Sequence, residues 1–246
     1  MRSVLLFVVH PASTGSLVDS TLPLDIVAVI PARFASTRFP GKPLADIEGR
    51  TMIEHVYRRA EASPVVSRVI VATDDLRIAT TVNEFGGNVR LTRPDHPTGT
   101  DRLAEVASSL DCDIIVNVQG DEPLLDPRAI AEVVAPFSDP SVSMTTLYRR
   151  IQTPAELSNP NVVKVVLDRA GFALYFSRAP IPYARDPRGV WPPLYRHIGV
   201  YAYHRCALLV LSSLEPTPLE RSEALEQLRA LEHGIRIRAV ETAYDS

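Results

Sequence analysis

Three positively charged side chains stand close together near the start of the chain, and their spacing indicates a site for a polyanion. Arg33, Arg38 and Lys42 lie within ten positions, in a segment that follows the apolar, β-branched run Ile26–Ile30. Such a run predicts a buried strand, and an open α/β sheet binds its ligands beyond the carboxyl ends of its strands. Three cations at that edge suit the phosphates of a nucleoside triphosphate.

The alternative for this loop is that its charges are merely solvated on the surface. Pro40 and Pro43 flank the Gly41-Lys42 pair, and two prolines restrict the backbone in a way that holds the lysine amine in place. This favours a ligand site. The loop is not a P-loop, because Pro43 stands where Ser or Thr would follow the lysine. Pro31 is predicted to end the strand before the loop, since proline donates no ladder hydrogen bond.

Carboxylates follow two further apolar runs. Asp121 comes shortly after Ile114–Val118, and Asp74 comes directly after Val69–Thr73. An aspartate at such a strand end, facing a cationic loop, suits Mg²⁺ that bridges phosphate oxygens. Asp121 could instead cap a helix or open a turn, and Asp75, next to Asp74, could cap the helix that follows.

Other polar side chains could contact a ligand. Arg178 stands at the end of a predicted strand without a partner nearby in the sequence, which fits an anionic ligand. His197 could contact a substrate or be a hydrogen-bonded core histidine. Glu223 and Gln227 are four residues apart in the predicted helix 218–231, so we expect them to share a face.

Apolar runs alternate with helical periodicity along the first half of the chain, which predicts an α/β fold with a mostly parallel, doubly wound sheet. A predicted hairpin interrupts this pattern in the middle. The predicted strands are 26–30, 69–73, 89–92, 114–118, 142–147, 162–167, 173–178 and 195–203. The predicted helices are 51–62, 76–85, 102–110, 205–213 and 218–231, with residues 96–102 as a loop.

Composition excludes several classes of protein. A chain of 246 residues can bury a large core, and a net charge of −3 gives no bulk attraction to nucleic acid or to an anionic membrane. No apolar run reaches the roughly 18 residues that would span a bilayer. Cys112 and Cys206 form no C-x-x-C pair, which indicates two inert core thiols in a reducing compartment. We expect residues 1–25 to be a poorly ordered extension and 26–246 to form one domain.

Seven segments between residues 26 and 241 resemble one known family. They are 31–44 (PARFASTRFPGKPL), 71–74 (VATD), 96–102 (HPTGTDR), 117–123 (NVQGDEP), 175–178 (YFSR), 196–201 (RHIGVY) and 218–229 (PLERSEALEQLR). Together they resemble the 3-deoxy-manno-octulosonate cytidylyltransferases, also called CMP-Kdo synthetases. The first segment alone indicates only a cytidylyltransferase for a sugar acid or a related substrate, and the later ones are specific to Kdo.

The resemblance implies a Rossmann-like nucleotidyltransferase sheet and a reaction in which the anomeric hydroxyl of Kdo attacks the α-phosphorus of CTP. It implies Mg²⁺ as cofactor, bound by Asp121. The catalytic residues it implies are Arg33, Arg38, Lys42 and Asp121. The nucleotide-binding residues it implies are Arg33, Ser36, Lys42, Asp74, Thr98, Gly99 and Arg102. The sugar-acid pocket it implies consists of Gln119, Arg178, His197, Tyr201, Glu223 and Gln227.

The resemblance also implies a homodimer in the cytoplasm that serves lipopolysaccharide biosynthesis, with a sugar-acid and dimerisation part at about residues 140–230. The family pattern continues beyond Tyr244-Asp245-Ser246 with a segment that supplies a second metal carboxylate, so we expect a chain truncated at its C-terminus. Two other functions stay open. They are transfer of CMP to a related acid, such as amino-Kdo or a sialic acid, and a relative that binds nucleotide without turnover.

Overall fold

The computed structural model of the chain describes residues 24–35, 39–186 and 193–244. Ser36 and Arg38, and nearly all of the extension expected for residues 1–25, lie outside these ranges. Within them, nine strands form one sheet in the order β11-β7-β10-β6-β1-β4-β5, and β8 pairs with both β10 and β9. These strands are β1 (Ile26–Ala32), β4 (Arg68–Thr73), β5 (Val89–Leu91), β6 (Ile114–Asn117), β7 (Met144–Arg150), β8 (Lys164–Leu167), β9 (Ala173–Ser177), β10 (Tyr195–His204) and β11 (Arg238–Glu241). A separate hairpin consists of β2 (Asp46–Ile47) and β3 (Arg50–Thr51).

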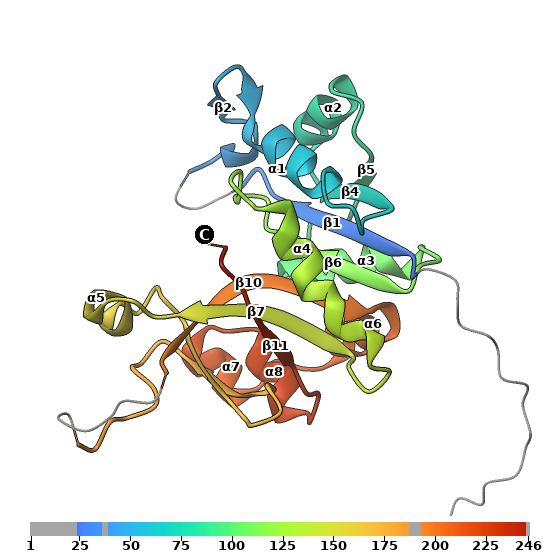
Figure 1. Cartoon of the computed structure of the whole chain (residues 1–246). Coiled ribbons are helices and arrows are strands. Elements are labelled where there is room, and N and C mark those ends of the chain that lie inside the picture. Colours follow the sequence, from blue (N-terminus) through green and yellow to red (C-terminus); the bar gives the residue numbers. More distant parts are fainter. Residues whose placement is uncertain (1–23, 36–38, 187–192, 245–246) are drawn as a thin grey trace, which may run out of the picture.

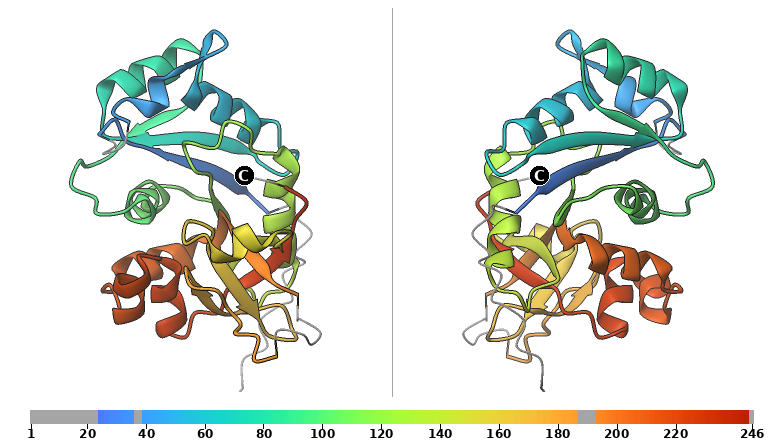
Figure 2. Two further views of the ribbon diagram at one scale, coloured as in Figure 1. Left: turned by 90° about the vertical axis from the view of Figure 1, so that its left-hand side faces the viewer. Right: turned by 90° about the vertical axis from the view of Figure 1, so that its right-hand side faces the viewer.

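The helices pack on both faces of this sheet, as the figures show (Figures 1 and 2). They are α1 (Met52–Glu61), α2 (Leu76–Glu84), α3 (Gly99–Ser108), α4 (Pro127–Val134), α5 (Pro154–Ser158), α6 (Arg205–Ser213), α7 (Pro218–Glu223) and α8 (Gln227–Glu232). Lys42–Leu44 and Ala135–Ser138 form short 3-10 turns. The expected α/β fold with a mostly parallel doubly wound sheet is confirmed, because β1 runs parallel to β4 and β6, and β4 runs parallel to β5.

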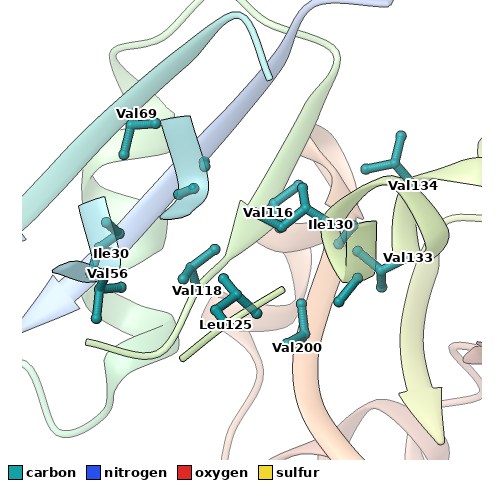
Figure 3. Packing of buried hydrophobic residues seen from close by; sticks show 14 of the residues in the cluster. Ile30, Val56, Val69, Val116, Val118, Leu125, Ile130, Val133, Val134 and Val200 are labelled. Carbon is teal, nitrogen blue, oxygen red and sulfur yellow. The ribbon is translucent and has the colours of Figure 1, made fainter. Parts of the chain in front are cut away.

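Alternating side chains of the central strands enter two separate cores, because successive residues of a strand face opposite sides of the sheet. Ala28 and Ile30 of β1 pack with α1, α2 and α4 on one face, whereas Val27 and Val29 pack with α3 and α6 on the other. Figure 3 shows the first core, where Val116 of β6 lies beside Ile130 of α4. Strands buried on both faces are mostly apolar, as their sequences predicted.

Three parallel strands bring their carboxyl ends to one edge of the sheet. β1 lies between β4 and β6, so the loops after these three strands start side by side. Beyond β6 the sheet continues with β10, which is antiparallel to β6 and β7, and the hairpin β8–β9 joins it there. α1 and α2 lie at one end of the molecule and α7 and α8 at the other (Figure 1).

Several predicted boundaries were wrong. β1 does not end at Pro31 but continues to Ala32. The pairing of β1 with β6 already ends at Val29, so the N–H that proline lacks at position 31 would have had no partner on β6. Helix α3 starts at Gly99, three residues before the predicted start at residue 102 and inside the predicted loop 96–102. It starts there because Thr98 and Asp101 form a capping box. Helix α1 begins after Thr51 as expected, but the Thr51 side chain makes no capping bond.

The predicted helix 218–231 is two helices, α7 and α8, so Glu223 and Gln227 do not share a helix face. Ala224 between them adopts the left-handed conformation, with φ 51°, which ends a helix. Helices α4 and α5 and strand β11 were not predicted. Cys112 is half-buried and Cys206 is exposed, so the expectation of two core thiols was wrong. Burial still raises the pKa of the Cys112 thiol to about 11, which keeps it unreactive.

Among the residues that the structure describes, no helix combines the length and the apolar character needed to cross a membrane.

Candidate active site

A first pocket, of about 260 Å³, lies at the carboxyl ends of β1 and β6. We call it the cationic pocket. Its walls are Pro31, Ala32, Arg33, Lys42, Pro43, Gly99, Gln119, Gly120 and Asp121. Lys42 Nζ lies 2.7 Å from Asp121 Oδ2, and both side chains are partly exposed. Arg33 Nη2 donates to the carbonyl of His96 at 2.6 Å, which anchors its guanidinium at the wall of the pocket.

The backbone around Lys42 is held as the flanking prolines suggested. Gly41 has φ 76°, a conformation that favours glycine. Its N–H donates to the carbonyl of Phe34 at 2.9 Å, and the N–H of Leu44 returns to the carbonyl of Gly41 at 2.8 Å. Lys42 therefore starts a short 3-10 turn and projects from a fixed backbone.

The ends of β1 and β6 approach so closely at Gly120 that a side chain would not fit. A Cβ atom there would lie 2.7 Å from the carbonyl oxygen of Pro31. Glycine thus lets the loop that carries Asp121 lie against β1. Asp121 caps no helix, since α4 is capped by Asp126; its carboxylate faces Lys42.

Asp74 and Arg102 are brought together, but below the surface of the site. Arg102 is fully buried, its Nη2 lies 3.1 Å from Asp74 Oδ1, and its Nη1 donates to Thr92. Burial lowers the pKa of Arg102, although Asp74 opposes this. Arg102 lines neither of the pockets described here. Asp75 caps α2, accepting from the N–H of Arg77 at 2.9 Å, which confirms the capping alternative for that residue.

A second pocket, of about 480 Å³, adjoins the first and shares Gly99 and Gln119 with it. We call it the polar pocket. It lies between β6, β10, the first turn of α3 and the α7–α8 junction. Of the residues predicted for the sugar-acid pocket, Gln119, Arg178, His197, Tyr201 and Gln227 line it. Asn117, Thr100, Glu226 and Arg229 also line it and were not predicted.

His197 lies in the polar pocket and is uncharged. Burial lowers its pKa to about 3. Its Nε2 lies 2.9 Å from the hydroxyl of Thr146, which itself lies 2.9 Å from the carbonyl of Val200. Because a hydroxyl has one proton, donated to Val200, His197 Nε2 carries the hydrogen and Nδ1 is an acceptor. His197 is thus hydrogen-bonded within the fold and also lines the pocket, and its contact with a substrate stays a prediction.

Three buried polar atoms of this pocket have no hydrogen-bond partner within the described residues. They are Asn117 Oδ1, the Tyr201 hydroxyl and Gln227 Nε2, on residues 4 %, 8 % and 7 % exposed. Buried polar groups are almost always paired, so three such atoms in one pocket indicate a polar ligand. Burial raises the pKa of Tyr201 well above its ordinary value, so its hydroxyl keeps its proton.

Arg178 is held firmly at the rim of the polar pocket. Its Nε donates to the carbonyl of Glu223 at 2.7 Å and its Nη1 to the carbonyl of Pro160 at 3.0 Å. The Glu223 carboxylate accepts from the N–H of Arg178 at 2.9 Å and from Ser177 at 2.5 Å. Burial raises the pKa of Glu223, but these bonds outweigh it and the net shift is downward. Glu223 does not line the pocket; it fixes Arg178.

The buried cation Lys164 was missed by sequence reasoning. Its Nζ donates to the carbonyls of Asn159, Val162 and Arg178 at 3.0, 2.6 and 2.5 Å, and burial lowers its pKa. Nothing in a β-strand pattern marks such a lysine. Asn117 could have been found, because it is a polar residue in an otherwise apolar strand and stands two positions before Gln119.

The donor set for a metal in the described residues is small. No three His, Cys, Asp or Glu side chains gather there as a ready multi-ligand site. Asp121 alone offers a carboxylate to the cationic pocket. Oxygen ligands suit Mg²⁺, which commonly uses one or two carboxylates together with substrate phosphates and water, so the residues present fit a metal shared with a phosphate ligand.

Comparison with known proteins gave concordant results. A family model described as cytidylyltransferase matches residues 27–237. Relatives named 3-deoxy-manno-octulosonate cytidylyltransferase include that of Solibacter usitatus, 57 % identical over 92 % of this chain and 89 % of the relative. Those of Geobacter sulfurreducens (55 %, covering 91 % and 93 %) and Syntrophotalea carbinolica (58 %, covering 89 % and 91 %) are equally similar.

Solved structures agree with the sequence relatives. A structure of CMP:2-keto-3-deoxy-manno-octonic acid synthetase complexed with CTP has a TM-score of 0.85 and is 46 % identical, covering 89 % of this chain and 90 % of that one. A 4-diphosphocytidyl-2C-methyl-D-erythritol synthase from Anaerococcus prevotii has a TM-score of 0.57 at 13 % identity, covering 90 % of each chain, and shares the fold alone.

Proposed function

The chain belongs to the 3-deoxy-manno-octulosonate cytidylyltransferases, and we propose that its two adjoining pockets bind the two substrates of that reaction. The enzyme transfers CMP from CTP to the anomeric hydroxyl of Kdo and releases pyrophosphate. The anomeric oxygen of Kdo forms a bond to the α-phosphorus of CTP. At the same time, the bond from the α-phosphorus to the oxygen that bridges it to the β-phosphorus breaks. The hydroxyl proton passes to solvent, and the leaving pyrophosphate takes the electron pair of the broken bond.

The observation that carries the assignment is the contrast between the two pockets. The cationic pocket holds Arg33 and Lys42, whereas the polar pocket presents unpaired neutral groups beside Arg178, and Gly99 and Gln119 line both. A triphosphate requires several cations, whereas a polyhydroxylated acid requires neutral hydrogen-bonding groups and one cation for its carboxylate. We therefore assign CTP phosphates to the first pocket and Kdo to the second, with the reacting atoms meeting at their shared wall.

Catalysis in this arrangement is mainly positioning and charge neutralisation, as in phosphoryl transfer generally. Lys42 and Arg33 would balance the charge that develops on the phosphate oxygens, and Arg38 and Ser36 stay predicted partners of the same phosphates. The first turn of α3 is capped by Thr98 and begins at Gly99, which lines the cationic pocket. Such a helix start favours an anion.

Arg102 and Asp74 serve the nucleotide indirectly in our proposal. Arg102 is fully buried and paired with Asp74, so we propose that it acts on the nucleotide through Asp74, and the direct contact with the cytidine that the resemblance implied stays a prediction. Arg102 holds Asp74 and the start of α3 together. Asp74 remains the member of this pair that is partly exposed, with its side chain 25 % accessible, and it is our candidate for contact with the nucleoside.

The polar pocket, to which we assign Kdo, combines a side chain held by hydrogen bonds to the backbone with polar side chains that have an unpaired atom. Arg178 gives three of its N–H groups to backbone carbonyls; a guanidinium has five, so the others can face the sugar-acid carboxylate. Tyr201, Gln227, Gln119 and His197 Nδ1 offer hydrogen bonds to hydroxyl groups.

We also propose Mg²⁺ as the cofactor, held by Asp121 together with phosphate oxygens of CTP. When bound, the ion supplies positive charge that neutralises the phosphates and orients them. Lys42, which pairs with Asp121 at 2.7 Å, would then share these phosphates. We further propose a homodimer through the part at about residues 140–230, and the cytoplasm, where CTP is available for lipopolysaccharide biosynthesis. Light scattering of the purified chain tests the dimer.

Pyrophosphate release tests the function directly. The purified chain with CTP, Kdo and Mg²⁺ should release pyrophosphate, and omission of Kdo or addition of excess EDTA should abolish the signal. Parallel reactions with amino-Kdo and with a sialic acid identify the preferred acid, which should be Kdo. CTP binding without any pyrophosphate release from these acids would favour a nucleotide-binding protein without turnover.

A further inference from the structure

Asn117 is a buried polar residue of the polar pocket for which the reaction as described gives no role. It is the last residue of β6, is only 4 % exposed, and lines the pocket. Its Oδ1 has no hydrogen-bond partner within the described residues. An acceptor buried in this way costs free energy unless something donates to it.

The neighbours of Asn117 include two other buried polar atoms without a hydrogen-bond partner. Asn117 and Tyr201 are direct partners in the antiparallel pairing of β6 with β10, so their side chains lie on the same face of the sheet and close together. The Tyr201 hydroxyl is also unpaired, and Gln227 Nε2 completes the set from α8. On the other side of β10, its register with β7 shifts between Ile198 and Tyr201, and such irregularities are common beside functional sites.

The chemistry of these atoms limits what can bind there. Asn117 Oδ1 can only accept a hydrogen bond, Gln227 Nε2 can only donate one, and the Tyr201 hydroxyl can do both. A carboxylate or a phosphate only accepts, so neither can satisfy Asn117 Oδ1. A hydroxyl group both donates and accepts, and can therefore satisfy Asn117 together with one of its neighbours.

We propose that Asn117 is a specificity-determining residue whose Oδ1 accepts a hydrogen bond from one ring or chain hydroxyl of the sugar acid, so that the pocket selects an acid carrying that hydroxyl. The inference rests on the proposed function and deepens it. Because a site built to bind a hydroxyl leaves its own groups unpaired when the hydroxyl is absent, it rejects the deoxy compound.

The test compares Asn117→Leu, which is similar in volume and lacks the acceptor, with the wild type on Kdo and on a series of singly deoxygenated Kdo analogues. We expect the wild type to lose about 10- to 100-fold in kcat/KM on one analogue relative to Kdo. Asn117→Leu should lose a similar factor on Kdo, with KM for CTP unchanged within about 3-fold. It should no longer distinguish Kdo from that same analogue.

The loss of discrimination is the decisive measurement, since a merely destabilised protein would lose the same factor in activity on both compounds and keep the wild-type preference for Kdo. Thr145→Val is the matched control. Thr145 is fully buried on β7 and donates to the carbonyl of Val133 at 2.6 Å, but lines neither pocket. The variant Thr145→Val should be less stable than the wild type but should keep the wild-type preference for Kdo over each analogue.

Two outcomes would overturn the inference, and they differ in what else fails. If the wild type is active but Asn117→Leu retains full kcat/KM for Kdo and rejects every analogue as before, Asn117 has no role in selection. If the wild type releases no pyrophosphate with CTP and Kdo, the proposed function fails and this inference fails with it.

Discussion

At the residue scale, the ion pair between Lys42 and Asp121 explains how the charges of the cationic pocket are balanced in the absence of a ligand. The two atoms lie 2.7 Å apart, and the side chains are 37 % and 55 % exposed. Pairs this exposed contribute at most about 1 kcal/mol. Incoming phosphates can therefore replace Asp121 as the partner of Lys42 at little cost, which leaves the carboxylate available for a cation.

Lys42→Ala should lower kcat about 10²- to 10³-fold while the fold is retained, because a fixed charge facing the developing charge is worth that much. Pyrophosphate release measures the rate, and circular dichroism checks the fold. Arg50→Ala is the control, since Arg50 is an exposed cation of β3 that lines neither pocket. Wild-type turnover in Lys42→Ala would remove the lysine from the mechanism.

His197 should make stability depend on pH. Its pKa is lowered by burial to about 3 in the folded chain, against about 6.5 when unfolded. Between these values the unfolded chain binds more protons, so stability falls as the pH is lowered from 6.5 toward 3 and is unaffected above 6.5. Because the ring borders a water-accessible pocket, we expect about 1–2 kcal/mol at pH 4.5.

His197→Gln, which cannot take up a proton, should remove that part of the slope. Urea unfolding of both proteins at pH 7.0, 5.5 and 4.5 gives the difference in unfolding free energy. The unfolding free energy of the wild type minus that of His197→Gln should decrease steadily from pH 7.0 to pH 4.5. A difference that is constant with pH would mean that the histidine is equally basic in both states.

Sequence spacing found the cations because Arg33 and Lys42 sit near one another in the chain, beside a recognisable strand end. It could not tell that Arg102 is buried under Asp74, since charge normally indicates exposure. Asn117 was overlooked for the opposite reason, as one polar residue closing an apolar strand. Both depend on what the sheet places next to them, which a local pattern does not contain.

At the element scale, the site depends on how closely β1 and β6 approach. Gly120→Ala would place a Cβ 2.7 Å from the carbonyl oxygen of Pro31, so the loop carrying Asp121 must move. We expect a loss of about 2 kcal/mol in unfolding free energy, in the range for overpacking, and a raised KM for CTP.

Gly99→Ala is the matched control for Gly120→Ala. Its Cβ would meet the Pro31 ring at an ordinary 3.6 Å, in the first turn of a helix, where alanine is favoured over glycine. Thermal unfolding should therefore separate the two variants, with Gly99→Ala at or above the wild-type Tm. If both variants unfold at the wild-type temperature, the loop has room to spare.

The predicted elements were most accurate where apolar runs are continuous, as in β1, β4 and β6. They failed where one residue decides. Ala224 takes a left-handed conformation without being glycine, so the break between α7 and α8 left no mark in the sequence. The capping box that starts α3 lies in the segment 96–102, for which the sequence predicts a loop.

At the scale of the whole molecule, a hydrogen bond between two distant segments of the chain joins the start of α3 to the far wall of the polar pocket. Thr100, in the first turn of α3, donates to the Glu226 carboxylate, just before α8, at 2.6 Å. These residues are 126 positions apart, and both line the polar pocket. Residue 99, next to Thr100, lines the cationic pocket as well. A nucleotide that fixes the start of α3 should therefore also fix the wall of the Kdo pocket.

Thr100→Val, which removes the donor and keeps the shape of the side chain, should weaken this coupling. In the wild type we expect a non-hydrolysable CTP analogue to raise the affinity for Kdo, and Kdo to raise the affinity for the analogue by the same factor, as linkage requires. A hydrogen bond to a carboxylate contributes about 1.5–3 kcal/mol at most, and exposure reduces this, so the factor should fall about 3- to 10-fold in the variant. Isothermal titration of Kdo with and without the analogue measures it, with Ser108→Ala, at the other end of α3, as the control. Equal coupling in Thr100→Val and the wild type would show that the two pockets communicate by another route, through Gln119 and the end of β6.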